Sequence, residues 1–171
     1  HKGTTQDRFD SLDEMTAAMV EGTEYFATEF VDYQSADGLY RKFRVFFIGP
    51  HTIFRHMIFS DFWNVHAKDR GRFMADRPDL IAEEEAMMAT PEGAFPPQVS
   101  QLLASVRERI DLDFFGIDFG IKADGRVLLF EANGTMNFFS PLPGEQFAYL
   151  RACVPPARAA FRELLGLPPR A

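Results

Sequence analysis

Three oxygen-bearing side chains in the C-terminal half of the chain have a spacing that suits metal chemistry. Asp118 lies within an otherwise apolar segment, and Glu131 and Asn133 end the next apolar segment, two residues apart. The intervening Lys-Ala-Asp-Gly at 122–125 is typical of a hairpin turn, which places Asp118 roughly opposite Glu131. Because side chains two residues apart on a strand share a face, Glu131 and Asn133 point the same way. The pattern predicts three oxygen ligands on one face of a hairpin.

Such a ligand set favours a hard cation. Carboxylate and amide oxygens suit Mg²⁺, which keeps several waters and is completed by substrate phosphates. Two carboxylates buried close together also carry dehydration and charge costs that a cation offsets. Each motif alone is more often a strand-end or turn feature than a ligand set. Together on one hairpin they predict a magnesium site that works with a nucleotide.

The segment 39–48 supplies cations that suit phosphate groups. It alternates, with Tyr40, Lys42 and Arg44 on one side and apolar residues on the other, which predicts a strand. Arg clamps a phosphate or an acyl phosphate with a forked pair of donors. Taken without other evidence, Lys42 and Arg44 fit an ordinary solvated strand face equally well.

The remaining elements are predicted from caps, turns and periodicity. A capping box from Ser11 to Glu14 starts a helix at about 12–20, and the aromatic run 25–33 predicts a strand that forms a hairpin with 39–48. Further expected elements are a strand at 52–60, helices at 78–88 and 98–110, strands at 114–121 and 126–132, and helices over 145–165 interrupted at Pro155 and Pro156. This order predicts an α+β fold with mainly antiparallel pairing.

Composition and charge exclude several classes of function. The chain has 171 residues, 46% of them hydrophobic, which suffices for one domain or two small lobes with a core. Its net charge of −7 disfavours general nucleic-acid binding, which needs a basic face. The single cysteine, Cys153, precludes an intrachain disulfide and suits a reducing compartment. Because no apolar run reaches the length of a membrane helix, we expect a cytoplasmic protein without membrane or nucleic-acid partners.

The segment from Gly116-Ile-Asp118 through the hairpin to Phe130-Glu-Ala-Asn133 resembles the metal-binding end of the ATP-grasp superfamily. That superfamily includes glutathione synthetases, D-alanine–D-alanine ligases and ribosomal-protein glutamate ligases. The resemblance covers roughly residues 1–139 and implies an ATP-grasp fold that lacks its N-terminal part, with mainly antiparallel sheets and flanking helices. It also implies that Asp118, Glu131 and Asn133 hold two Mg²⁺ ions, or Mn²⁺ in their place, against the phosphates of ATP.

The resemblance implies further roles upstream. Glu29, Phe30 and Val31 match the interlobe strand whose backbone meets the adenine, and Lys42 and Arg44 match the basic residues that bind phosphates and support catalysis. The segment 1–5 resembles the end of the Gly-rich loop that covers the phosphates. The implied organisation is the end of a nucleotide lobe at 1–30, a C-terminal lobe with the metal site at 31–144, and a helical tail at 145–171.

The implied activity is that of an ATP- and Mg²⁺-dependent ligase, which activates a carboxylate as an acyl phosphate and joins it to an amine or a similar nucleophile. The substrate is a small molecule or a peptide, and assembly into a homo-oligomer is compatible with this activity. Asn137, Arg55 and His56 are candidates for the substrate side, although a hydrogen-bonded structural role is the commoner one for a lone His.

Two other classes of function remain open. One is a non-catalytic nucleotide-binding module of the same fold. The other is a hydrolase such as a glycosidase, with Asp118 and Glu131 as paired carboxylates, which leaves Asn133 and the basic strand unexplained.

Overall fold

The structure, a computed structural model, describes residues 6–138 and 144–168 of the chain. The chain divides into two units, His1–Asp32 and Tyr33–Ala171. The first unit contains helix α1, Leu12–Ala18, which begins as predicted because the Ser11 side chain accepts a hydrogen bond from the Glu14 backbone N–H at 3.2 Å. The helix ends at Ala18, two residues earlier than expected.

The predicted strand at 25–33 is wrong, and so is its hairpin with 39–48. Residues 25–33 have no helical or strand structure, and Phe26 is 91% exposed. The physical reason lies in the pairing of strand β1, Tyr40–Ile48, which has a strand on each side and so has no free edge for a further one. An aromatic and β-branched run favours a strand only where a partner edge is available.

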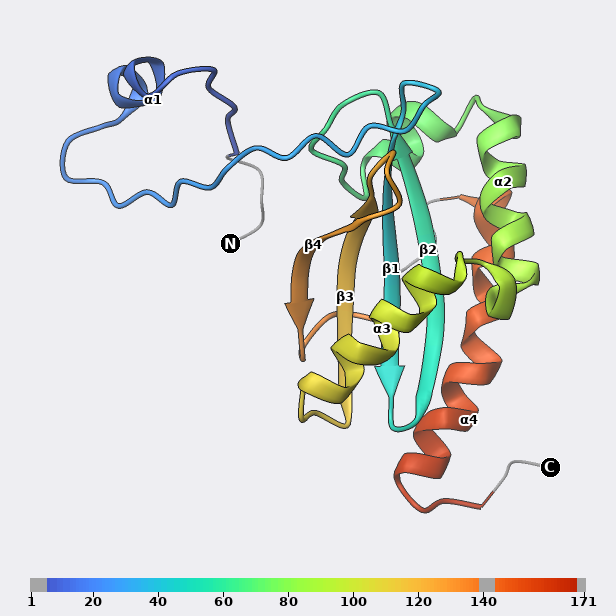
Figure 1. The fold of residues 1–171 in the computed structure, drawn as a ribbon. Coiled ribbons are helices and arrows are strands. Elements are labelled where there is room, and N and C mark those ends of the chain that lie inside the picture. The colour runs from blue at the N-terminus through green and yellow to red at the C-terminus, as the bar shows by residue number, and fades with distance from the viewer. Residues whose placement is uncertain (1–5, 139–143, 169–171) are drawn as a thin grey trace. The chain divides into compact units, whose positions relative to one another are not determined.

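Four antiparallel strands form one sheet in the second unit, in the order β2-β1-β3-β4 (Figure 1). The strands are β1, β2 (His51–Ser60), β3 (Phe114–Ile121) and β4 (Val127–Asn133). Their bounds agree with the predicted strands to within one residue. The sheet and its flanking helices confirm the α+β class.

Two β-bulges interrupt the sheet. In β2, His56 pairs with Arg44 and Phe54 pairs with Val45, so Arg55 is an extra residue without an opposite partner. In β4, Glu131 pairs with Asp118 and Leu129 pairs with Phe119, which makes Phe130 the extra residue. The two bulges therefore border the same row of paired residues across the sheet.

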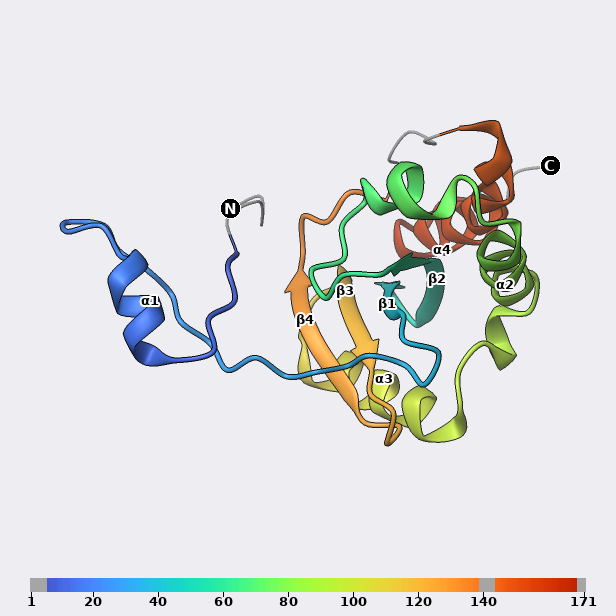
Figure 2. The ribbon, with the colours of Figure 1, turned by 90° about the horizontal axis from the view of Figure 1, so that it is seen from above.

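Helices cover both faces of the sheet. They are the π-helix η1 (Arg70–Met74), α2 (Pro78–Ala89), the 3₁₀ turn η2 (Pro91–Gly93), α3 (Pro97–Arg109), the 3₁₀ segment η3 (Glu145–Cys153) and α4 (Val154–Leu164). Seen from above, α3 lies on one face and α4 on the other (Figure 2). Pro155 and Pro156 do not interrupt a helix as predicted. They lie in the first turn of α4, where a missing N–H costs nothing.

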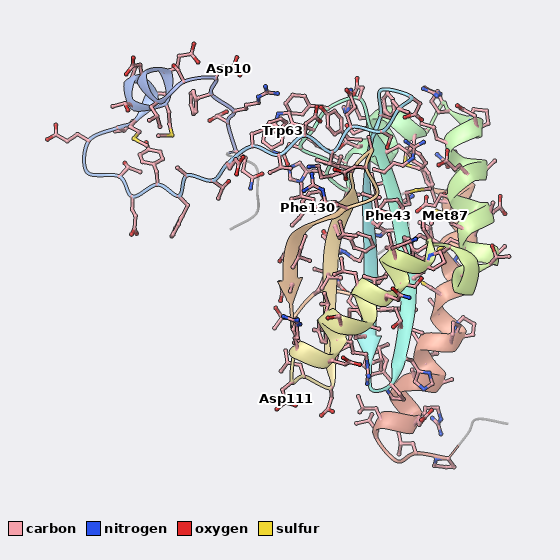
Figure 3. The ribbon with its side chains drawn as sticks, viewed as in Figure 1. Asp10, Phe43, Trp63, Met87, Asp111 and Phe130 are labelled. Carbon is pink, nitrogen blue, oxygen red and sulfur yellow. The ribbon has the colours of Figure 1, made fainter. Side chains whose placement is uncertain are left out.

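Phenylalanine side chains fill the core on both faces of the sheet. Phe43 of β1, labelled in Figure 3, stacks on Phe119 with ring centroids 5.4 Å apart on the face of α3. On the face of α4, Phe46 contacts Phe138 with ring centroids 4.9 Å apart. The two faces alternate along β1 as the sequence pattern predicts. Within the described ranges, no helix has the length and apolar character needed to cross a membrane.

Candidate functional site

A row of charged and polar side chains crosses the sheet from β2 to β4. His56, Arg44, Asp118 and Glu131 are successive partners on β2, β1, β3 and β4. Directly opposed residues on antiparallel strands point to the same face, so all four side chains share one face of the sheet. The row runs from the half-buried His56 to the exposed Glu131.

At the centre of the row, Arg44 binds Asp118 through a forked ion pair. Arg44 Nε lies 2.6 Å from Asp118 Oδ1 and Nη2 lies 2.7 Å from Oδ2, while Lys42 Nζ is 3.6 Å from the same Oδ2. The Asp118 side chain is only 5% exposed, so its charge is neutralised inside the protein. Burial lowers the pKa of Lys42, and the nearby Asp118 opposes that shift. Lys42 and Arg44 therefore share a face, as predicted, and both act on one carboxylate.

At the edge of the row, Asn133 is bonded to Glu131. Its Nδ2 donates to Glu131 Oε1 at 2.9 Å, and its Oδ1 accepts from the backbone N–H and the hydroxyl of Thr135 at 2.7 and 2.8 Å. The contact confirms that Glu131 and Asn133 share a face. The register confirms that Asp118 lies opposite Glu131. The hairpin thus brings the three predicted ligands to one side of the sheet.

These three residues fit a magnesium ion by donor type. Within residues 6–138 and 144–168, no group of three or more His, Cys, Asp and Glu side chains is placed to hold a metal ion. The predicted set combines two carboxylates with the amide of Asn133. Because Asn133 Oδ1 already accepts two hydrogen bonds from Thr135, it would have to release one of them to bind a cation. In this structure the charge that a cation would supply to Asp118 comes from Arg44. Metal binding would therefore compete with this ion pair or share its oxygens.

Of the predicted substrate residues, His56 belongs to the row and Arg55 is the bulge residue next to it on β2. Arg55 is 7% exposed, and its Nε donates to the Phe138 carbonyl oxygen at 3.1 Å. Among the described residues, Arg55 Nη1 and His56 Nε2 are buried without a hydrogen-bond partner. Burial, reinforced by Arg70 and other nearby cations, holds the pKa of His56 well below its usual value, so the ring is neutral at pH 7. Asn137, the third candidate, is exposed beside Phe138.

A buried carboxylate near the row was not predicted from the sequence. Glu84 of α2 is fully buried and accepts hydrogen bonds from Arg70, from the Tyr149 hydroxyl and from the Met57 backbone N–H, all between 2.6 and 2.8 Å. Burial and Glu84 together raise the pKa of Tyr149 well above its usual value. A signal existed in the sequence, because Leu80, Glu84 and Met88 are four residues apart and share the buried side of α2.

The residues matched to the adenine site lie in the first unit. Glu29, Phe30 and Val31 are not in a strand, and the guanidinium of Arg8 lies 4.1 Å from the centre of the Phe30 ring. Their contact with a nucleotide stays a prediction. The segment 1–5, matched to the phosphate-covering loop, is outside the described residues.

Comparisons of the chain with protein-family models, with curated proteins and with solved structures give no match. The fold defines an α+β protein whose antiparallel sheet carries a charged row between two bulges. Any assignment of function therefore depends on the chemistry of that row.

Proposed function

We propose that this chain is the catalytic part of an ATP- and Mg²⁺-dependent ligase of the ATP-grasp type. The observation that carries the proposal is the row itself, in which Arg44, Asp118 and Glu131 are direct partners on three adjacent strands and Asn133 is bonded to Glu131. Phosphoryl transfer needs fixed cations beside hard oxygen donors. The spacing of Asp118, Glu131 and Asn133, which resembles the superfamily's metal-binding segment, supports the same assignment.

Five residues in and beside the row have defined tasks in this proposal. Asp118, Glu131 and Asn133 hold Mg²⁺, which when bound neutralises the negative charge of the ATP phosphates. Lys42 and Arg44 bind phosphate oxygens, and the bond from Arg44 to Asp118 fixes the guanidinium before the nucleotide arrives. Such preorganisation lowers the barrier because little reorientation is left for the reaction itself.

The proposed reaction has two steps. A substrate carboxylate oxygen attacks the γ-phosphorus of ATP, so that ADP leaves and an acyl phosphate forms. The lone pair of an amine then attacks the acyl carbon, inorganic phosphate leaves, and the amine loses a proton as the carbon–nitrogen bond forms. The protein contributes positioning and charge stabilisation and forms no covalent bond with the substrates.

The paired-carboxylate hydrolase accounts for the geometry less well. A glycosidase needs one carboxylic acid that gives up a proton and one carboxylate that faces the sugar or a water. Both oxygens of Asp118 are instead occupied by Arg44, and Lys42 lies beside them. The ligase gives these two cations a task, and the hydrolase does not.

Isothermal titration of ATP into the full chain, with and without Mg²⁺, tests the proposal. The informative variant is Glu131→Gln, and Glu145→Gln is its matched control because Glu145 is an exposed carboxylate in η3. We expect Mg²⁺-dependent binding in the wild type and in the control, weakened about 10-fold or more in Glu131→Gln. ATP binding by the wild type that is equally strong with and without Mg²⁺ contradicts the proposal.

A second measurement separates a ligase from a nucleotide-binding module that does not turn over. Release of ADP is followed while panels of carboxylic acids and amines are added to the chain with Mg²⁺ and ATP. Acid-dependent release of ADP supports the ligase. Binding of ATP without release under any of these conditions supports the module.

A further inference from the structure

Four cationic side chains act electrostatically on the His56 ring, namely Lys42, Arg44, Arg55 and Arg70, and Arg44 is the direct partner of His56 on β1. Three of them have a carboxylate partner, since Arg44 and Lys42 contact Asp118 and Arg70 contacts Glu84. In the part of the chain that the structure describes, Arg55 forms no ion pair with any carboxylate.

Arg55 is nonetheless buried, at 7% exposure. Its Nε donates to the Phe138 carbonyl, which is an uncharged acceptor, and its Nη1 is buried without a hydrogen-bond partner among the described residues. Burial lowers its pKa, and Arg70 and Arg44 act in the same direction. A buried guanidinium with unused donors is costly, and an anion that accepts hydrogen bonds from it removes that cost.

We infer that Arg55 Nη1 and His56 Nε2 form a subsite for a carboxylate group of the substrate. The planar guanidinium presents parallel donors that match the two oxygens of a carboxylate. The neutral His56 ring donates one further hydrogen bond, without adding a charge, in the tautomer that carries the proton on Nε2. Attribution of this carboxylate to the acid or amine substrate of a ligase rests on the proposed function. The existence of the anion subsite itself does not rest on the proposed function.

The charges of the cluster favour a carboxylate over a phosphate. Lys42 and Arg44 contact Asp118, and Arg70 contacts Glu84, whereas the single positive charge of Arg55 has no ion-pair partner among the described residues. A carboxylate carries one negative charge, whereas a phosphate monoester carries about 1.5 to 2 near neutral pH. The phosphate-binding cations of the proposed function, Lys42 and Arg44, are separate from Arg55.

Thermal unfolding of the full chain without nucleotide tests the subsite. The probes are sodium acetate, sodium phosphate and sodium chloride at equal ionic strength, and the variants are Arg55→Met and, as a matched control, Arg41→Met. Arg41 is a partly buried arginine that already binds Asp37 and Glu83. We expect acetate at tenfold excess over its Kd to raise the Tm of the wild type and of Arg41→Met by about 3 °C. Arg55→Met should show no such shift.

The stability of the variants without added anion gives an independent readout. Removal of an unpaired buried charge should raise the Tm of Arg55→Met above that of the wild type, whereas Arg41→Met, which loses its ion pairs, should have a lower Tm. Equal acetate shifts in the wild type and Arg55→Met overturn the inference, and so does a lower Tm of Arg55→Met. A shift with phosphate but not with acetate also overturns the carboxylate assignment.

A measurement on the wild type, with Arg55→Lys used only to assign one signal, covers the case in which Arg55→Met does not fold. The arginine side-chain N–H signals are recorded by nuclear magnetic resonance during an acetate titration, and the Arg55 signal is identified by its absence in Arg55→Lys. A saturable shift of that signal supports the subsite, and an unchanged signal overturns it. Because ATP and Mg²⁺ are absent, failure of this test is distinct from failure of the proposed function.

Discussion

Arg44 binds both carboxylate oxygens of Asp118, through Nε at 2.6 Å and Nη2 at 2.7 Å, from the strand directly beside it. The pair is shielded from solvent, with the Asp118 side chain 5% and the Arg44 side chain 20% exposed. For such a pair the net contribution to stability is small, but the loss of one partner is costly because it leaves a buried charge.

Replacement of Arg44 by methionine should therefore destabilise the protein. We expect Arg44→Met to lower the free energy of unfolding by about 3 kcal/mol, at the low end for broken buried pairs because Lys42 remains near Asp118. The double variant Arg44→Met/Asp118→Asn should recover most of that loss. Urea denaturation of the two single variants and the double variant measures the coupling, and additive effects would contradict a direct interaction.

Magnesium should stabilise Arg44→Met more than it stabilises the wild type. In that variant the Asp118 carboxylate lacks its main counter-charge, and a bound cation would replace it. The Tm is measured with increasing MgCl₂ against NaCl at equal ionic strength. Arg44→Met/Glu131→Gln is the control, because it lacks one of the proposed ligands. The same response in all three proteins would argue against Asp118 and Glu131 as metal ligands.

Stability should decrease as the pH falls below about 6.5, because His56 stays neutral in the folded protein. Its pKa is held well below the usual value by burial and by nearby cations, so only the unfolded chain takes up the proton. The free energy of unfolding should fall by up to about 1.4 kcal/mol per pH unit from this residue. Urea denaturation at several pH values should give a shallower slope for His56→Gln, and an unchanged slope would show that His56 does not titrate in this way.

Glu84 should be the most sensitive position outside the row. Glu84→Ala leaves Arg70 buried without its carboxylate and should cost about 3–5 kcal/mol of stability. Tyr149→Phe removes one of the bonds to Glu84 and should cost about 1–2 kcal/mol. Urea denaturation measures both changes. If Tyr149→Phe lowered the free energy of unfolding more than Glu84→Ala, the ion pair between Arg70 and Glu84 would not be the main contribution of Glu84 to stability.

Gly116 should not tolerate a side chain. It is the partner of Asn133 in the ladder, and a Cβ there would lie 2.7 Å from the Met136 sulfur and 2.8 Å from the Phe46 ring. Gly116→Ala should therefore cost about 1–3 kcal/mol of stability, measured by urea denaturation. Gly71→Ala is the matched control, because nothing lies within 4 Å of its Cβ position. Equal effects at the two positions would contradict crowding at Gly116.

The hairpin that carries the predicted metal ligands could be predicted because its information is local. The turn at Gly125, which has a φ of +82°, and the alternation of the flanking strands define the pairing of β3 with β4. The bulge at Phe130 could not be predicted, since nothing in the alternation marks it. The pairing of Arg44 with Asp118 was also missed, because it joins residues far apart in the sequence and depends on which strands become neighbours.

The wrong strand at 25–33 has the same origin. Its composition favours a strand, but strand formation needs a free partner edge, and both edges of β1 are taken by β2 and β3. The candidate site likewise combines features that local sequence predicts with features that depend on three-dimensional packing. Chemistry-bearing residue types such as Asp118 and Glu131 were found by spacing, whereas the buried partners of Arg70 and the unused donors of Arg55 emerge only from three-dimensional packing.

The bulge at Phe130 determines to which face of the sheet the later residues of β4 point. In an uninterrupted ladder continued from the turn, Asp118 would face Phe130, and Glu131 would fall opposite Ile117, on the other side of the sheet. The single extra residue reverses that assignment and carries Glu131 and Asn133 to the side of Asp118. The bulge at Arg55 does the same for His56 relative to Arg44. The row therefore depends on two bulge residues that have no opposite partner in the ladder. A sheet without these bulges would keep all four strands but would not bring the residues of the site to one face.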